Sequence, residues 1–292
     1  MCGVIGIWGN GPVIRDLYQG LLAIQHRGQD SAGVITFDGR FHTKKGNGLV
    51  HDIFTPEAVQ HLRGPIGVGH TRYPTIGGGG GEDAQPFQLN SPFGIIMAHN
   101  GNVANYRELR DELFQQHHRL LNSDCDLEIL LNIFAESLAH ERTKNLAPEH
   151  VFRAVEAVFD KVRGSYSVVA YIAEQGLVAF RDPYGIKPLA YGVRRDGLLP
   201  SYAVASETVS LNIMNFGEIK DVEAGEIDPL EEAGRGAGPI PSSTRSTSTS
   251  AGSTSAGPWP RRSAGASWPS TSSSPSPTRP ATPPSRSPAS ST

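Results

Sequence analysis

A sharp change in composition near residue 233 constrains this chain of 292 residues more than any other feature. From residue 233 to the end, every residue except Ile240, Trp259 and Trp268 is Ser, Thr, Pro, Ala, Gly or Arg. Such a segment has too little apolar surface to offset the entropy that ordering it would cost. We therefore expect a folded domain over residues 2–227 and a low-complexity, disordered tail over residues 228–292.

The charges divide in the same way. The chain has a net charge of −3, yet the tail carries six Arg and no acidic residue, which leaves about −9 on residues 1–232. An acidic body argues against a nucleic-acid partner. No apolar run approaches the ~20 residues that a membrane span needs, and the N-terminus has no signal-peptide pattern. Two cysteines make neither a disulfide scaffold nor a four-cysteine zinc site. We expect a cytoplasmic protein without a membrane partner.

The body shows the pattern of an α+β protein. Runs rich in β-branched residues predict strands near residues 2–8, 33–37, 66–70, 93–99, 166–172, 177–181 and 202–206. Helical spacing of apolar residues predicts helices over about 13–25 and from residues 126 and 148. Because several strands follow one another directly, mostly antiparallel sheets are favoured over a βαβ alternation. The glycine run at 77–81 lacks the GK[ST] ending of a phosphate loop, so we expect a mobile surface loop.

Cys2, which follows Met1 directly, is the first candidate for chemistry. Cysteine is small enough for the initiator to be removed, which would leave a thiol and a free α-amine on one residue. The unperturbed pKa is about 7.7–8.0 for the amine and about 8.5 for the thiol. A neutral amine can therefore accept the thiol proton, and the nucleophile needs no separate histidine. On position alone, a small apolar residue that begins a strand is the simpler interpretation.

Four polar motifs accompany this cysteine. They lie at residues 25–33, 69–75, 98–102 and 123–124. Each is weak alone, because Asn-Gly after a strand is usually a turn and Ser-Asp before a helix is usually a cap. In this order and spacing, together with Cys2, they resemble the glutaminase domain of class II glutamine amidotransferases. The resemblance covers residues 2–227 and implies an N-terminal-nucleophile hydrolase fold, an αββα sandwich with two antiparallel sheets between helical layers.

The resemblance also implies a role for each motif. Cys2 would attack the side-chain amide of glutamine, with its own amine as base and then as acid. The Asn100 side chain and the Gly101 N–H would form the oxyanion hole. Arg72 would bind the α-carboxylate of glutamine, and Asp124 would bind its α-ammonium group.

Other positions receive weaker assignments. Arg27 and Gly28 would shape the backbone around the nucleophile and the substrate. For Arg72 an ordinary surface ion pair is the alternative, and for Asp124 a helix cap, which is compatible with substrate binding. Cys125 departs from the family's usual Thr or Ser, and we expect a packed small residue there.

Three more positions near the motifs are assigned no catalytic or substrate-binding role. Asp126 stands where the family usually has Glu. His70 and His99 are expected either to support neighbouring residues of the site or to be structural, and neither has partners at metal-ligand spacing. We therefore expect no metal and no cofactor in the glutaminase domain.

Residues 85–87, 181–189 and 205–208, with the motifs at 26–33 and 98–102, resemble one branch of this family. That branch passes ammonia to phosphoribosyl pyrophosphate and so makes 5-phosphoribosylamine, the first step of de novo purine synthesis. A complete member continues into a phosphoribosyltransferase domain that uses Mg²⁺, and some members carry an iron–sulfur cluster or form homo-oligomers. No Val-Ile-Pro-Val-Pro-Asp-Ser type of phosphoribosyl-binding loop follows here.

The tail has the composition that GC-rich coding DNA gives when it is read out of frame. One back-translation of Asp-Leu-Val-Ile-Pro-Val-Pro-Asp-Ser, read one base late, reproduces residues 271–279, and one of Glu-Tyr-Val-Tyr-Phe reproduces 246–250. We predict that residues 228–292 are an out-of-frame remnant of the second domain, so that the chain keeps only the glutaminase half. A genuine linker or interaction tail is the alternative. Other interpretations of the whole chain are an inactive fragment, a non-catalytic interaction protein or another class II amidotransferase.

Overall fold

The structure is a computed structural model that describes residues 1–73, 80–141, 146–197 and 199–231. These residues all lie in the first of two compact units, Met1–Arg245, whereas the second unit, Ser246–Thr292, lies outside the described residues. The predicted out-of-frame tail beyond residue 231 and residues 77–79 of the predicted loop at 77–81 therefore fall outside the described part of the chain, whereas Gly81 begins the short helix η2 (Gly81–Asp83). Among the described helices, none is long and apolar enough to cross a membrane.

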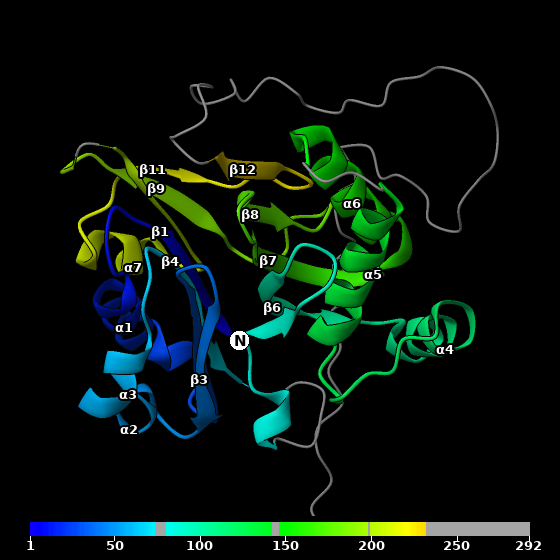
Figure 1. Ribbon diagram of the computed structural model, residues 1–292, viewed down its shortest axis with the longest axis horizontal. Helices are drawn as coiled ribbons and strands as arrows, with labels where there is room; N and C mark the ends of the chain where they lie inside the picture. Colours follow the sequence, from blue (N-terminus) through cyan, green and yellow to red (C-terminus); the bar gives the residue numbers. More distant parts are fainter. Residues whose placement is uncertain (74–79, 142–145, 198, 232–292) are drawn as a thin grey trace, which may run out of the picture. The chain divides into compact units, whose positions relative to one another are not determined.

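Seven strands form the first sheet, in the order β11-β9-β10-β1-β4-β2-β3, and all neighbours are antiparallel (Figure 1). Their bounds are β1 (Gly3–Trp8), β2 (Ser31–Phe37), β3 (Phe41–Asn47), β4 (Ile66–Arg72), β9 (Ala190–Arg194), β10 (Ser201–Ala205) and β11 (Gly217–Asp221). Strand β1 lies at the centre and places Gly3 opposite Thr71 of β4. The N-terminus of the chain is thereby aligned with the end of β4.

Five strands form the second sheet, in the order β12-β8-β7-β6-β5, and its pairs are antiparallel too. Their bounds are β5 (Phe87–Leu89), β6 (Ile95–Val103), β7 (Gly164–Ile172), β8 (Gly176–Arg181) and β12 (Ile227–Glu231). The long pairing of β6 with β7 sets Asn100 opposite Ser167 and Gly101 opposite Tyr166. The motif at residues 98–102 is therefore part of a regular strand rather than of a turn.

Helices cover the outer faces of both sheets (Figure 1). Those near the first sheet are α1 (Ile14–Ala23), η1 (Gln25–Arg27), α2 (Val50–Ile53), α3 (Pro56–His61) and α7 (Thr208–Ile213); the others are η2 (Gly81–Asp83), α4 (Tyr106–His117), α5 (Leu127–His140) and α6 (Pro148–Lys161). One apolar cluster joins α1 and α7 to the first sheet, and another joins α4, α5 and α6 to the second. A third, which includes Val4, Val68 and Val169, lies between the sheets. This order of layers confirms the predicted αββα sandwich.

The sequence prediction missed the elements with little apolar character. Helix α4 buries only Leu109 and Leu113, and the edge strands β3 and β11 have no buried residue, so neither shows a strong apolar period. The expected end of the folded domain at Ile227 also needs correction. Strand β12 continues to Glu231, because its backbone pairs with β8 over five residues.

Candidate active site

The site forms where the start of β1 and the end of β4 approach β6 of the other sheet. Gly3 pairs with Thr71, and the next residues outward are Cys2 and Arg72. The His70 ring lies between the sheets, with Nε2 3.2 Å from the carbonyl oxygen of His99. Because a carbonyl can only accept, His70 donates from Nε2 and so joins the end of β4 to the strand that carries Asn100.

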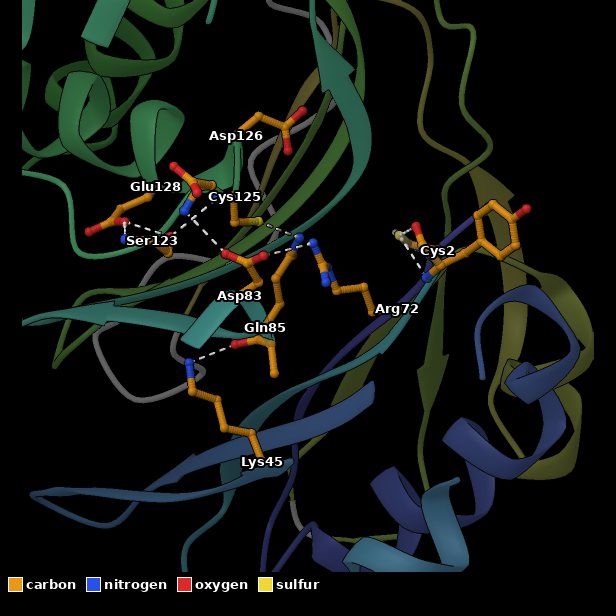
Figure 2. A network of polar contacts seen from close by, with 12 residues as sticks. Cys2, Lys45, Arg72, Asp83, Gln85, Ser123, Cys125, Asp126 and Glu128 are labelled. Atoms are coloured by element: carbon orange, nitrogen blue, oxygen red, sulfur yellow. Dashed lines mark hydrogen bonds and ion pairs between the residues drawn. The ribbon is translucent and has the colours of Figure 1, made fainter. Parts of the chain in front are cut away.

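Cys2 is a buried thiol, with 6% of its surface exposed. Its Sγ lies 3.5 Å from both the backbone N and the carbonyl oxygen of Tyr73, just past the end of β4 (Figure 2). Burial raises the pKa of Cys2, while the Tyr73 backbone contact, the N-terminal charge and Arg72 act in the opposite direction, and Asp126 adds to the rise. The thiol is therefore protonated at neutral pH and needs a base before it can attack.

Arg27 holds the main chain of the nucleophile. Its buried guanidinium donates from Nε to the carbonyl oxygen of Cys2 at 2.8 Å and from Nη1 to Glu207 at 2.6 Å. The Glu207 carboxylate also lies 3.2 Å from Nε2 of His26. Burial would raise the pKa of Glu207, but the bonds from Arg27 and His26 hold it below its usual value. Sequence analysis gave Glu207 no role, although the residue lies in the quoted motif at 205–208.

Gly28 permits the close approach of η1 to the end of β4. A Cβ on this glycine would lie 2.4 Å from the carbonyl carbon of Arg72 and 2.7 Å from its carbonyl oxygen. Both atoms belong to the backbone, so neither can rotate away. The structure thus places Arg27 and Gly28 against the backbone of Cys2 and Arg72.

Asn100 offers a buried hydrogen-bond donor without a partner. The residue is 1% exposed, and among the described residues its Nδ2 finds no hydrogen-bond acceptor. An unsatisfied buried donor costs about 1–3 kcal/mol, so it is retained for a reason other than stability. A donor fixed in this way is what an oxyanion hole requires, because it loses no protein partner when negative charge develops beside it.

Gly101 follows directly and packs tightly against β7. A Cβ here would lie 2.7 Å from the carbonyl oxygen of Ser165 and 2.8 Å from Cβ of Tyr166. Any larger residue would push β6 away from β7 and displace Asn100 with it. The structure therefore brings the two predicted oxyanion-hole residues together on one rigid strand.

Arg72 ends β4 and is 3% exposed, so the alternative of a surface ion pair is excluded. Its Nη2 lies 3.4 Å from Oδ2 of Asp83, and the other Asp83 oxygen accepts the backbone N–H of Asp124 at 3.1 Å (Figure 2). Asp83 thus connects Arg72 to the segment that precedes α5. The side chain of Asp124 is exposed, and the contact made by this residue comes from its backbone.

Asp126, two residues further on, is the buried carboxylate of this region. It is 3% exposed; Oδ2 accepts the Val103 N–H at 2.9 Å, and Oδ1 lies 3.3 Å from Nε2 of His99. Burial would raise the pKa of the Asp126 carboxyl, but His99 and Val103 hold it below its usual value. An ionised carboxylate therefore acts on Cys2 from α5. Sequence analysis noted Asp126 only as a departure, and its place at the start of the long apolar helix was the available signal.

Cys125 is inert by comparison. It is 2% exposed, and burial raises the pKa of its thiol to about 12. Its Sγ lies 3.5 Å from the Nε2 of Gln85, which donates to it (Figure 2). A thiol of this kind is a packing residue and a weak acceptor, in agreement with the sequence analysis.

A pocket of about 390 Å³ lies beside this network, lined by residues that include Lys45, Glu82 and Glu128 but not Cys2 or Asn100. Two of its charged groups already have partners: Lys45 donates to the Ala84 carbonyl oxygen at 2.6 Å and lies over the Phe87 ring, and Glu128 accepts from the Ser123 hydroxyl at 2.7 Å. Among the described residues there is no group of three or more His, Cys, Asp or Glu side chains that could hold a metal ion.

The chain is similar to known proteins over most of its described part. Residues 75–212 match the family model of the glutamine amidotransferase domain. This stretch of the chain is similar to a glutamine amidotransferase domain. Over 238 residues it is 47% identical to the amidophosphoribosyltransferase of Escherichia coli K12, covering 80% of this chain and 47% of that protein. It is 43% identical over 233 residues to the enzyme of the same name from Saccharomyces cerevisiae, covering 77% of this chain and 46% of that protein.

Solved structures show the same similarity. The glutamine phosphoribosylpyrophosphate amidotransferase of B. subtilis superposes with a TM-score of 0.66 at 28% identity, covering 79% of this chain and 47% of that one. A structure described as the allosteric regulatory enzyme of purine biosynthesis gives a TM-score of 0.67 at 29% identity with the same coverage. The chain spans about half the length of the curated relatives it matches.

Proposed function

We propose that this chain hydrolyses the side-chain amide of free L-glutamine, with Cys2 as the nucleophile. The observation that carries the proposal is the Asn100 amide, which is buried and unpartnered next to Gly101 on a strand that is joined to the end of β4. Arg27 holds the Cys2 carbonyl in place, so that the nucleophile and the oxyanion donors are set on rigid elements.

The reaction needs a free α-amine on Cys2. While Met1 is attached, the Cys2 nitrogen belongs to a peptide bond and cannot act as a base; Met1 itself is 58% exposed and accessible for removal. The neutral amine then takes the thiol proton as Sγ bonds to the amide carbon of glutamine. Asn100 and Gly101 donate to the resulting oxyanion, the protonated amine gives its proton to the leaving ammonia, and a thioester remains. Water hydrolyses the thioester, releasing glutamate and the free thiol, so no cofactor is required.

Recognition of the amino-acid end requires one cation and one anion. We assign the α-carboxylate to Arg72, whose planar guanidinium suits a bidentate contact. For the α-ammonium we assign Asp126 in place of Asp124, because Asp126 is the buried carboxylate with an electrostatic effect on Cys2, whereas the Asp124 side chain is exposed.

The fate of the ammonia is a further part of the proposal. The relatives named above are amidophosphoribosyltransferases, and this chain spans about half of their length. We propose that the ammonia serves to aminate phosphoribosyl pyrophosphate, giving 5-phosphoribosylamine for purine synthesis, and that the chain as given supplies only the glutaminase half. The Mg²⁺ site, any iron–sulfur cluster and any homo-oligomer interface would belong to the synthase half.

A glutamine-dependent ammonia assay tests the proposal. We expect the chain without Met1 to release ammonia and glutamate in equal amounts, and Cys2→Ala to reduce release to the uncatalysed rate. Cys125→Ala is the matched control, because its thiol is buried and held protonated; activity should change by less than about threefold. If Cys2→Ala and the unaltered chain release ammonia equally, the proposal is wrong. Absence of activity from the unaltered chain would favour an inactive fragment.

A further inference from the structure

The amide of Gln85 has only one orientation that fits its surroundings. Gln85 is 2% exposed, and its Oε1 lies 2.9 Å from the backbone N of His99. A backbone N–H can only donate, so the oxygen must face it and the NH₂ group must point the other way. That NH₂ group lies 3.0 Å from Nδ1 of the same His99 ring.

This orientation determines the tautomer of His99. The Gln85 NH₂ group can only donate, so Nδ1 of the ring has to be the unprotonated acceptor. The single proton of the neutral ring is then on Nε2, which lies 3.3 Å from Oδ1 of Asp126. Among the described residues, Nε2 of His99 makes no hydrogen bond with good geometry. The Asp126 carboxylate is therefore the acceptor to which Nε2 can donate.

Asp126 is thereby held from two points of one strand. His99 and Val103 both belong to β6; the first contacts Oδ1, and the second donates to Oδ2 at 2.9 Å. Asn100 and Gly101 lie between them on the same strand. The position of the carboxylate is therefore coupled to that of the oxyanion donors. Glutamine has a fixed separation between its α-ammonium and its amide, so such coupling aligns both ends of the substrate.

We propose that Gln85 and His99 are positioning residues that select for the α-ammonium group of glutamine, by holding Asp126 in register with Asn100 and Gly101. The proposal rests on the proposed function and deepens it. The tautomer matters, because the proton on Nε2 of His99 faces Oδ1 of Asp126 and so helps to hold that carboxylate in place. Gln85 fixes this tautomer by presenting only donors to Nδ1.

Kinetics with two ligands tests the proposal. Glutaramate has the amide and carboxylate of glutamine but no α-ammonium, and its inhibition constant against glutamine measures binding without that group. We expect His99→Leu and Gln85→Met to raise the KM for glutamine about tenfold with kcat changed less than about threefold, while the glutaramate constant moves less than about twofold. His99→Gln, which retains an amide N–H near Nε2, should recover most of the loss. His42→Leu removes a histidine–carboxylate contact with Asp38 elsewhere and should change nothing.

The tautomer is tested without activity. In ¹⁵N-histidine NMR spectra of the unaltered chain at pH 7, the signal that is lost in His99→Gln should show a protonated Nε2 and an unprotonated Nδ1. A protonated Nδ1 would overturn the proposal, as would equal losses for glutamine and glutaramate in His99→Leu. Neither result would affect the proposed function, which fails only if ammonia release is absent or independent of Cys2.

Discussion

At the residue scale, the site depends on a buried donor without a hydrogen-bond partner, on a buried thiol and on two glycines that leave space. Asn100 keeps a buried amide N–H unpaired, and Cys2 keeps its proton because burial disfavours the thiolate. Gly28 and Gly101 contribute the space that a side chain would occupy. Each of these features costs stability or restricts the sequence, and each becomes useful only when a substrate brings the missing partner.

The Asn100 side chain gives the first prediction. Asn100→Ala should lower kcat for glutamine hydrolysis by about 10²–10³, with little change in KM, because one oxyanion-hole donor acts mainly in the transition state. Stability should not fall by the amount expected for a lost hydrogen bond, since the Nδ2 donor has no described partner. Steady-state kinetics and urea unfolding measure the two effects. Asn102→Ala, an exposed position on the same strand, is the control, and an equal loss of kcat there would contradict the assignment.

At the element scale, the short segment before α5 links the helix to the site. The Glu128 carboxylate, in the first turn of α5, accepts from the backbone N–H groups of Asn122 and Ser123 and from the Ser123 hydroxyl, at 2.7–3.1 Å (Figure 2). Asp124 follows and donates its N–H to Asp83, the partner of Arg72. One carboxylate thus organises the loop through which α5 reaches the end of β4.

This arrangement predicts that Glu128→Gln destabilises the chain and weakens glutamine binding. The loss of charge-assisted acceptors for the loop should lower the free energy of unfolding by about 1–3 kcal/mol. The KM for glutamine should rise, because the loop also carries the Asp124 contact to Asp83. Urea unfolding followed by circular dichroism measures the stability. Glu149→Gln is the matched control, since Glu149 is also in a first helical turn but is exposed; it should cost less than about 1 kcal/mol.

At the scale of the whole molecule, two sheets that are each covered by helices meet through an apolar interior, and the site lies where polar residues interrupt it. His70 is such an interruption: it is fully buried between the sheets and bonded to the His99 carbonyl. Burial holds the pKa of His70 well below its usual value of 6.5, and the nearby His99 and Arg72 act in the same direction. The fold therefore requires the neutral ring.

The pH dependence of stability follows from this requirement. Below pH 6.5 the unfolded chain binds a proton at His70 that the folded chain does not, so stability should fall by up to about 1.4 kcal/mol per pH unit as the pH drops toward the lower folded pKa. Urea unfolding at pH 7, 6 and 5 measures it. His70→Gln, which keeps an N–H donor, should flatten the slope between pH 6.5 and 5, whereas His42→Gln should not. An unchanged slope in His70→Gln would contradict the interpretation.

The sequence by itself determined the class of the domain and most of the positions where chemistry is placed. Apolar periods identify the central strands and long helices, because those elements are buried and their side chains must match the core. The resemblance of the motifs to the glutaminase domain led to Cys2, Arg72, Asn100 and Gly101, and the structure brings these to the ends and middle of neighbouring strands. The edge strands and α4 could not be predicted in the same way, because their mostly polar faces carry little periodic signal.

Only the tertiary structure decided which polar groups meet. It distinguished the buried Asp126 from the exposed Asp124, two residues apart, because a difference of two positions at the start of a helix turns a carboxylate from solvent to core. It also joined Arg27 to Glu207 and Gln85 to His99, pairs separated by 180 and 14 residues. Local sequence does not predict such contacts, because burial and hydrogen-bond partners depend on how distant strands pack against one another.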